Sequence, residues 1–170
     1  DMVLADDNFA TIVSAVEEGR RIYDNIRKSI QFLLSSNLSE VLTIFIATLA
    51  GFVVLEPVHL LWINLITDSF PAMALGVEKG EPDIMKRAPR NSKDGIFAGG
   101  MGIDVVWQGL MVSVVTLLAY YAGMHLAHGT DEFVHQNGMT MAFLTLSLAE
   151  IFHSFNMRAR RELSLIHISE

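Results

Sequence analysis

Apolar residues are gathered into four runs along the chain instead of being spread evenly. Each run supplies the roughly 20 residues that a helix needs to cross about 30 Å of hydrocarbon. The pattern therefore predicts an all-α membrane protein with four transmembrane helices, and a soluble bundle of fully buried helices is the alternative. The predicted spans are about residues 30–55, 58–77, 103–124 and 139–157.

A different periodicity precedes the first apolar run. Between residues 12 and 33, apolar residues recur at spacings of three, four or seven, and charged residues occupy the remaining surface, as in an amphipathic helix. Asp6, Asp7 and Asn8 offer an N-cap. Because no proline interrupts the pattern, we predict a cytoplasmic stalk helix over residues 11–29 that continues into the first span as one rod. A separate surface helix is the alternative.

The charges are sorted in a way that a soluble protein does not require. Lysine and arginine fall into three groups, which lie before the first span, between the second and third, and after the fourth, and the other two connections contain none. With four spans, these three groups share one side of the membrane, and the positive-inside rule makes that side the cytoplasm. We therefore predict a multi-pass membrane protein whose stalk and whose end at residues 158–161 are cytoplasmic.

The remaining composition narrows the possible functions. Nucleic-acid binding has no support, because the net charge is −7 and no basic face with interleaved aromatic residues is present. The chain has no cysteine, which excludes disulfides and thiolate metal sites. The connection 125–138 holds three histidines whose spacing fits no zinc pattern, so we interpret it as a solvated loop, with a metal site as the alternative. The connection 78–95 contains glycines, prolines and charges of both signs, a composition that predicts an ordered, turn-rich loop.

Three carboxylates, Glu40, Asp68 and Glu150, lie well inside the apolar runs. An ionisable residue at that depth is a functional-site hypothesis, because even forgiving scales assign about 2.5–3.5 kcal/mol to Asp at a helix centre. Hard oxygen donors of this kind suit Ca²⁺ better than a transition metal. We predict a cation site if the three faces converge, and a structural kink with interhelical hydrogen bonds is the alternative. Each carboxylate has a polar residue three or four positions before it, on the same face of its helix: Asn37 with Glu40, Asn64 with Asp68, and Ser147 with Glu150. Thr67 lies directly before Asp68 and three residues after Asn64, in the same polar set.

Two further positions carry local predictions. Pro71 has no N–H to donate to the carbonyl of Thr67, and its ring crowds that carbonyl. We therefore predict that the helix is loosened at Thr67 and Asp68, as irregular backbone at the membrane midplane is tolerated where it lines a cavity. Asp104 lies at the cytoplasmic start of the third span, where we predict a helix N-cap.

Long stretches of the sequence match a known family. The segments "DMVLADDNFATIVSAVEEGRRIYDNIRKSIQFLLSSN", "LLWINLITDSFPAMALG" and "EPDIMKRAPR" closely resemble the C-terminal part of P-type cation-transporting ATPases, specifically the SERCA-like, type IIA calcium-pump subgroup, and bacterial members of it. The resemblance covers about residues 1–161. Sodium–potassium pumps are less similar, because they carry different residues around Asp68 and an Asp-type residue in place of Glu150.

The resemblance implies a division of the chain. Residues 1–10 resemble the end of the phosphorylation domain, 11–29 the stalk, and 30–161 the family's fifth to eighth transmembrane helices. Residues 162–170 depart from the family and resemble translated sequencing-adaptor read-through, so we expect this tail to be non-native. The family's calcium ligand positions fall on six residues, with Asp68 shared between two ions: Asn37, Glu40, Asn64, Thr67, Asp68 and Glu150.

The function that the resemblance implies is ATP-driven calcium transport. The family's aspartyl-phosphate motif, its nucleotide and actuator domains and its first four spans are absent from the 170 residues, so we expect a fragment that is not catalytic alone. ATP and Mg²⁺ would then act only in the full-length protein, with the missing N-terminal part and the lipid bilayer as partners. Clustered carboxylates without a cation would take up protons, which predicts that the pump exchanges Ca²⁺ for protons. We expect the membrane to be a bacterial plasma membrane. The alternatives are a P-type pump for Mn²⁺, Na⁺ or K⁺, and a non-enzymatic four-helix membrane module.

Overall fold

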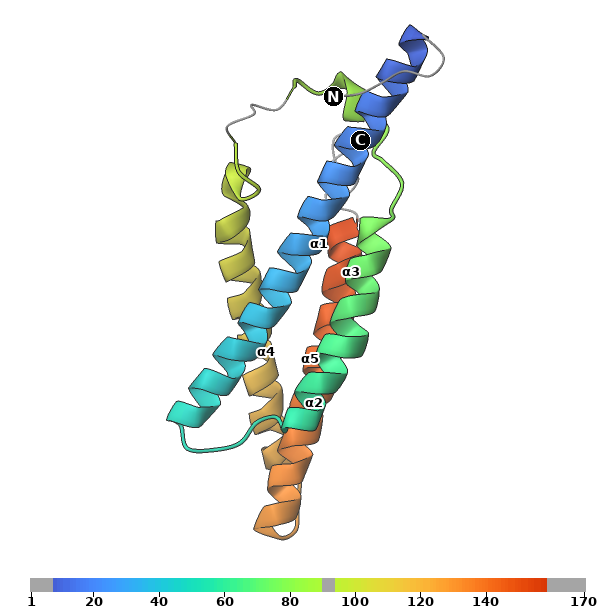
Figure 1. Ribbon diagram of the computed structural model, residues 1–170. Helices are drawn as coiled ribbons and strands as arrows, with labels where there is room; N and C mark the ends of the chain where they lie inside the picture. The colour runs from blue at the N-terminus through green and yellow to red at the C-terminus, as the bar shows by residue number, and fades with distance from the viewer. Residues whose placement is uncertain (1–7, 90–93, 159–170) are drawn as a thin grey trace, which may run out of the picture.

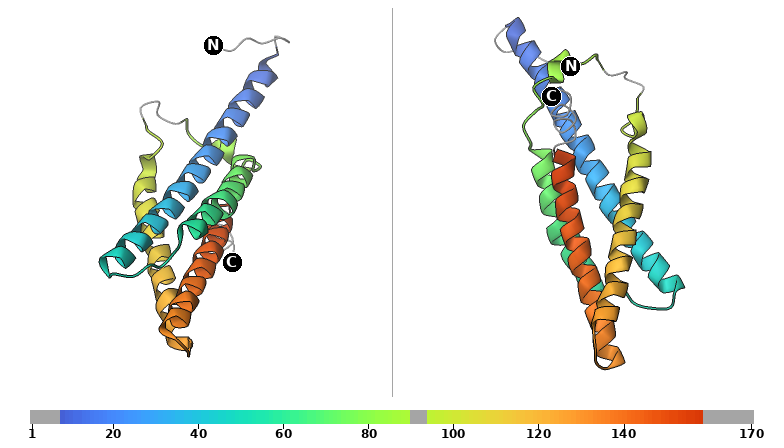
Figure 2. Two further views of the ribbon diagram at one scale, coloured as in Figure 1. Left: turned by 60° about the horizontal axis from the view of Figure 1, so that its bottom comes forward. Right: turned by 180° about the vertical axis from the view of Figure 1, so that it is seen from behind.

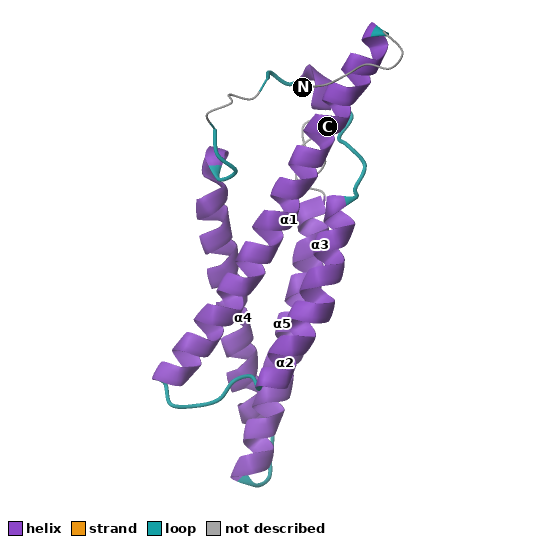
Figure 3. Ribbon diagram, viewed as in Figure 1, coloured by secondary structure: helices purple, strands orange, loops and turns teal. Residues whose placement is uncertain are grey.

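The computed structural model describes residues 8–89 and 94–158, and these residues form helices and connections with no β-strand among them (Figure 3). Four helical stretches are long and apolar enough to cross a membrane, which confirms the predicted fold class. The elements in chain order are α1 (Phe9–Leu49), α2 (Pro57–Trp62), the π-helical segment η1 (Ile63–Asp68), α3 (Ser69–Gly76), the short 3₁₀ helices η2 (Ile84–Lys86) and η3 (Ala98–Gly100), α4 (Met101–Leu126) and α5 (Asp131–Arg158).

Successive spans run in alternating directions (Figures 1 and 2). The connections 50–56 and 127–130 therefore lie at one end of the bundle. The described parts of the connection 77–97 and the last turn of α5 lie at the other end, together with the N-terminal half of α1, which extends beyond the other helices. The described segments that carry lysine and arginine thus share one end of the molecule, as the sequence predicts.

α1 is one uninterrupted helix of 41 residues, about 60 Å long at ~1.5 Å per residue. This confirms the continuous rod predicted for the stalk and the first span. Asn8 is the N-cap, and its side-chain oxygen accepts a hydrogen bond from the backbone N–H of Ala10 at 3.0 Å. The helix ends at Leu49, short of the predicted residue 55, because the chain turns at Gly51, where φ is 82°.

In the membrane-spanning half of α1, the buried face is largely polar and the exposed face is largely apolar. Gln31 and Thr43 are buried, whereas Val41 and Phe45 are 62% and 58% exposed. Such a helix suits lipid, where apolar side chains face acyl chains and polar groups must find partners within the bundle. Thr43 does so, because its hydroxyl oxygen lies 2.7 Å from the carbonyl of Ser39 on its own helix and 3.0 Å from Ser113 Oγ on α4. The polar interior that results is the environment of the three carboxylates.

The second span stays helical from α2 through η1 to α3. We predicted loosened backbone at Thr67 and Asp68, and the structure shows a wider π-helix ending at Asp68 instead of an unwound segment. Pro71 removes one backbone donor from the turn that follows. The hydroxyl of Ser69 donates to the carbonyl of Asn64, five residues earlier, at 2.7 Å. The span therefore adapts to the proline by changing its helical pitch without breaking.

Two helix starts differ from the sequence predictions. The N-cap of α4 is Gly100, with φ 85°, so the predicted cap at Asp104 is wrong, and this residue lies in the first turn, where its charge suits the helix dipole. α5 begins at Asp131, inside the segment that we interpreted as a loop. Thr130 starts it by accepting a hydrogen bond from the N–H of Phe133 at 3.4 Å. The third histidine of that segment, His135, is therefore helical.

α4 and α5 pack closely because each helix places a glycine against side chains of the other. A Cβ added to Gly123 would lie 2.8 Å from Met141 Cγ, and one added to Gly138 would lie 2.8 Å from Met124 Cγ. Small residues allow this approach in membrane helices, where packing and not the hydrophobic effect holds helices together. The carbonyl of Gly123 also accepts a hydrogen bond from the amide of Asn137 at 2.7 Å. α5 is thereby fixed against α4 at its N-terminal end.

The described part of the loop 78–95 is turn-rich, as predicted, and is docked on α1. The guanidinium of Arg87 bonds to Asp83 at 2.8 Å, to Asp24 on α1 at 2.6 Å, and to Glu81. The hydrogen bonds with Asp83 and Asp24 raise the pKa of Arg87 above its ordinary value, so it stays charged at any physiological pH. From α1, Arg20 donates to the carbonyl of Arg87 at 2.9 Å. The loop and the stalk half of α1 are thus joined at several points.

Candidate metal centre

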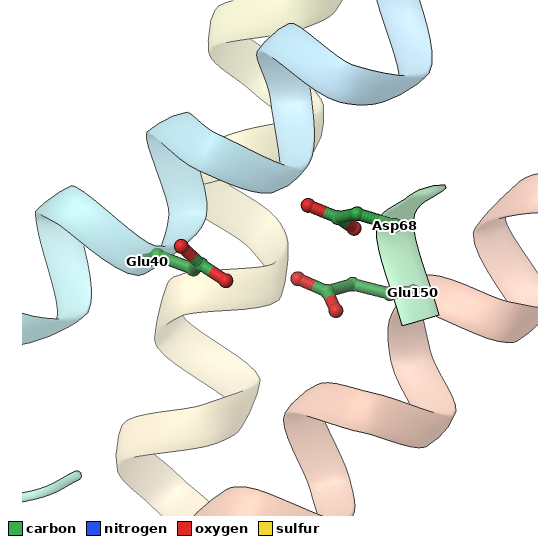
Figure 4. A group of neighbouring side chains, drawn as sticks. All are labelled: Glu40, Asp68 and Glu150. Atoms are coloured by element: carbon green, nitrogen blue, oxygen red, sulfur yellow. The ribbon is translucent and has the colours of Figure 1, made fainter. Parts of the chain in front are cut away.

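Three helical elements contribute one carboxylate each to a buried cluster. Glu40 comes from α1, Asp68 from the end of η1 and Glu150 from α5, and their side chains point toward one another (Figure 4). One oxygen from each lies within 4.8 Å of the others. The residues are only 5%, 1% and 1% exposed. The three carboxylates identified in the sequence therefore meet.

Two neutral side chains hold the carboxylates in place. The amide of Asn64 donates to both oxygens of Glu40, at 3.0 and 3.2 Å. The hydroxyl oxygen of Thr67 lies 2.9 Å from Glu150 Oε2 and 2.9 Å from the carbonyl of Ile63. Both side chains belong to η1, so the π-helical segment carries the groups that orient the carboxylates of α1 and α5.

Several buried oxygens around the cluster have no hydrogen-bond partner among the described residues. They are both carboxylate oxygens of Asp68, Oε1 of Glu150 and the hydroxyl of Ser36. The hydroxyl of Ser36 faces Asp68 without forming a hydrogen bond of ordinary geometry. Buried polar atoms normally find partners, so an unpartnered group of them indicates a place for an ion.

The donor set suits a hard cation. No described lysine or arginine forms an ion pair with the three carboxylates. Like charges this close repel, and a bound cation or protons must offset that repulsion. Carboxylate, amide and hydroxyl oxygens from the cluster, Asn64 and Thr67 are the ligands that Ca²⁺ takes, six to eight at about 2.3–2.6 Å. Among the described residues, one group of three His, Asp or Glu side chains lies close enough together to hold a metal ion, and it is this cluster. The histidines of residues 125–135 are not part of it.

One residue of the predicted ligand set lies apart from the others. Asn37 is exposed, and its amide donates to the carbonyl of Leu33 on its own helix at 2.7 Å. Asn37 lies three residues before Glu40, a spacing that places both on one side of the helix. Each residue turns an α-helix by about 100°, so three residues fall about 60° short of a full turn, and the two side chains point in directions about 60° apart. A ligand role for Asn37 stays a prediction that this arrangement does not support.

Sequence reasoning missed Ser36. Its hydroxyl is buried next to Asp68, and the residue stands four positions before Glu40, one turn along the same face of α1. That spacing was available in the sequence. Serine in a membrane helix commonly bonds back to its own backbone, so the residue type alone does not identify a site.

The fold and the cluster together define an integral membrane protein with three buried carboxylates between its helices, placed so that they could hold a cation. The chain belongs to the cation-transporting ATPases, since the family model described as "Cation transporting ATPase, C-terminus" matches residues 52–169. That match overlaps residues 162–170, which lie outside the described residues, and their non-native origin stays a prediction.

Curated relatives agree with the family. The chain is 45% identical to calcium-transporting ATPase 1 of Bacillus cereus over 94% of its length, and 46% identical to the calcium-transporting ATPase of Bacillus subtilis over 93%. It is 41% identical to calcium-transporting ATPase 1 of Lactococcus lactis over 95%. The chain spans between 17% and 19% of the length of these three relatives.

Proposed function

We propose that this chain is the part of an ATP-driven calcium pump that holds the transported ion within the membrane. The observation that carries the proposal is the buried cluster of Glu40, Asp68 and Glu150, each from a different helical element, with oxygens within 4.8 Å of one another. The three relatives named as calcium-transporting ATPases support calcium as the ion.

The proposed ligands are the three carboxylates together with Asn64 and Thr67. Asp68 is central, because both of its oxygens are unpartnered and its carboxylate faces the other two elements (Figure 4). In our proposal Asp68 bridges two ions. Asn37 would join the ligands of one ion if its side chain turned inward. When the ions leave, protons replace them on the carboxylates, so the pump exchanges Ca²⁺ for protons.

The parts that use ATP and Mg²⁺ would lie outside this chain, in the remaining length that the relatives possess. In the proposed pump, residues 1–10 end a phosphorylation domain, although residues 1–7 lie outside the described residues. Residues 11–29, the first half of α1, would relay the motion of that domain toward Glu40. The orientation that we propose places this half and the loop 78–95 in the cytoplasm of a bacterial cell.

Calcium uptake into inside-out vesicles tests the proposal. The full-length protein that contains this chain is expected to accumulate calcium when ATP is added, and Glu40→Gln and Asp68→Asn are each expected to abolish uptake while the protein still inserts. Uptake that survives in both variants would show that the site assignment is wrong. Uptake of Mn²⁺, Na⁺ or K⁺ in place of Ca²⁺ identifies a pump for another cation. Calcium binding without ATP-dependent uptake identifies a non-enzymatic membrane module.

A further inference from the structure

Hydrogen bonds join the three elements of the cation site in pairs. Asn64 links η1 to α1 through Glu40, and Thr67 links η1 to α5 through Glu150. A third hydrogen bond joins α5 to α1 directly, between His153 Nε2 and Ser35 Oγ at 3.0 Å. The three links close a ring around the carboxylates.

The third link is well built. His153 is 8% exposed and Ser35 is 2% exposed, and the imidazole packs against the ring of Phe32 with centroids 5.8 Å apart. Ser35 Oγ also lies 2.9 Å from the carbonyls of Phe32 and Gln31, which can only accept. We therefore assign the hydroxyl as the donor to its own helix and His153 as the donor to the hydroxyl, in the tautomer that carries its proton on Nε2.

The third link also differs in kind from the other two. Those run through Glu40 and Glu150, which are themselves proposed ligands, so a bound ion competes for their oxygens. His153 stands three residues after Glu150, on the next turn of α5, and Ser35 stands five residues before Glu40 on α1. A link made without ligand atoms can persist when the ion is bound.

We propose that His153 is a positioning residue for the cation site. Its hydrogen bond to Ser35 holds α5 against α1 at the register that keeps the carboxylate of Glu150 within reach of an ion bound to Glu40 and Asp68. The inference rests on the proposed function, since it assigns a role in that same site. It identifies a residue that acts through Glu150 without contacting the ion.

The test compares substitutions that remove or keep the donor, made in the full-length protein that contains this chain. His153→Leu removes the N–H and leaves Ser35 bonded to its own backbone. His153→Gln retains a side-chain N–H donor. Ser154→Ala is the matched control, because its hydroxyl donates to the carbonyl of Ile151 within α5. The measurements are the calcium concentration for half-maximal ATP-dependent uptake and the rate at saturating calcium.

Removing a residue that orients a metal ligand typically weakens metal binding by about 10- to 100-fold. We expect a loss of calcium affinity of that size in His153→Leu, with little change in the rate at saturating calcium. His153→Gln is expected to restore most of the lost affinity. Ser154→Ala is expected to match the unmodified protein. Adding Ser35→Ala to His153→Leu is expected to cost nothing further, because the bond is already absent.

Three outcomes overturn the inference. One is an unchanged calcium affinity in His153→Leu, and another is an equal loss in His153→Leu and His153→Gln, which would show a role in packing alone. The third applies if His153→Leu does not fold: the Ser35→Ala variant is then measured in its place, and an unchanged calcium affinity in Ser35→Ala overturns the inference. These results leave the proposed function intact, whereas an unmodified protein with no calcium-dependent uptake overturns both.

Discussion

The substitution Asp68→Asn should stabilise the protein without calcium and remove its response to calcium. At 4.8 Å, the distance within which the three carboxylates offer oxygens to one another, two unit charges repel by about 3.5 kcal/mol at an effective dielectric constant of ~20. Three ionised carboxylates make three such pairs, about 10 kcal/mol in total, which is comparable to the whole stability of a typical domain. Asp68 takes part in two of the three pairs.

Replacing Asp68 with the isosteric amide therefore removes up to about 7 kcal/mol of repulsion from the fully ionised, calcium-free state. Protons relieve the same repulsion, so the gain is largest at alkaline pH and shrinks as pH falls. Calcium is expected to favour the unmodified protein, because an ion that binds the proposed site of the folded state alone stabilises that state. That effect is about 2.7 kcal/mol at a hundred times the dissociation constant.

Thermal unfolding in lipid nanodiscs measures both effects. With a calcium chelator at pH 9, Asp68→Asn is expected to unfold at a higher temperature than the unmodified protein, with a smaller difference at pH 6. Added calcium is expected to raise the midpoint of the unmodified protein far more than that of the variant. Asp131→Asn, a change of the same type in the exposed first turn of α5, serves as the control and should shift stability by less than about 1 kcal/mol. A variant that is no more stable in chelator at either pH, and that still responds to calcium, would refute the reasoning.

Other features of the fold give further predictions. Arg87→Ala should release the loop 78–95 from α1, at a cost of about 1–3 kcal/mol because Asp24, Glu81 and Asp83 lose a charged donor, and limited proteolysis should then cut the loop faster. Gly138→Leu should separate α4 from α5 and lower the free energy of unfolding by about 1–3 kcal/mol through overpacking, measured against Gly102→Ala, whose added methyl group meets nothing within 4 Å. Asn8→Ala should cost about 1 kcal/mol and speed hydrogen exchange in the first turn of α1.

Much of the fold could be predicted because lipid imposes simple rules. Spans need a fixed length of apolar residues, and the polar face of a membrane helix must point inward. Those rules predicted the four spans and the continuous α1. They could not predict where helices end, because this depends on single residues such as Gly51 and Thr130. A glycine with φ 82° ends α1 early, and a threonine cap starts α5 inside a segment that looks like a loop.

The candidate site was predictable to the extent that it depends on one helix at a time. Intramembrane carboxylates and their neighbours at helical spacing can be read from the sequence, and they predicted Glu40, Asp68 and Glu150. Which neighbour faces the cluster depends on the rotation of each helix, which is set by packing against the other helices. The sequence therefore placed Asn37 beside Glu40, whereas in the structure Asn37 is exposed and Ser36 is buried next to Asp68.

The distribution of the proposed ligands over three elements suggests how the proposed site could release its ion. A site built on one rigid helix keeps its geometry when that helix moves. Here Glu40, Asp68 and Glu150 belong to α1, η1 and α5, so a helix shift of about 1–2 Å, a size common in switching proteins, is enough to separate oxygens that must all lie within about 2.6 Å of one ion. α1 is the element best placed to move, because it extends beyond the bundle as a continuous rod and carries Glu40 within it (Figure 1). The link between His153 and Ser35 ties α5 to this same helix. Side chains of α1 also donate to the second span, from Ser29 to the carbonyl of Ala72 at 2.9 Å and from Asn25 to the carbonyl of Gly76 at 3.4 Å. In the proposed pump, a motion of α1 would therefore act on both of the other elements that carry proposed ligands.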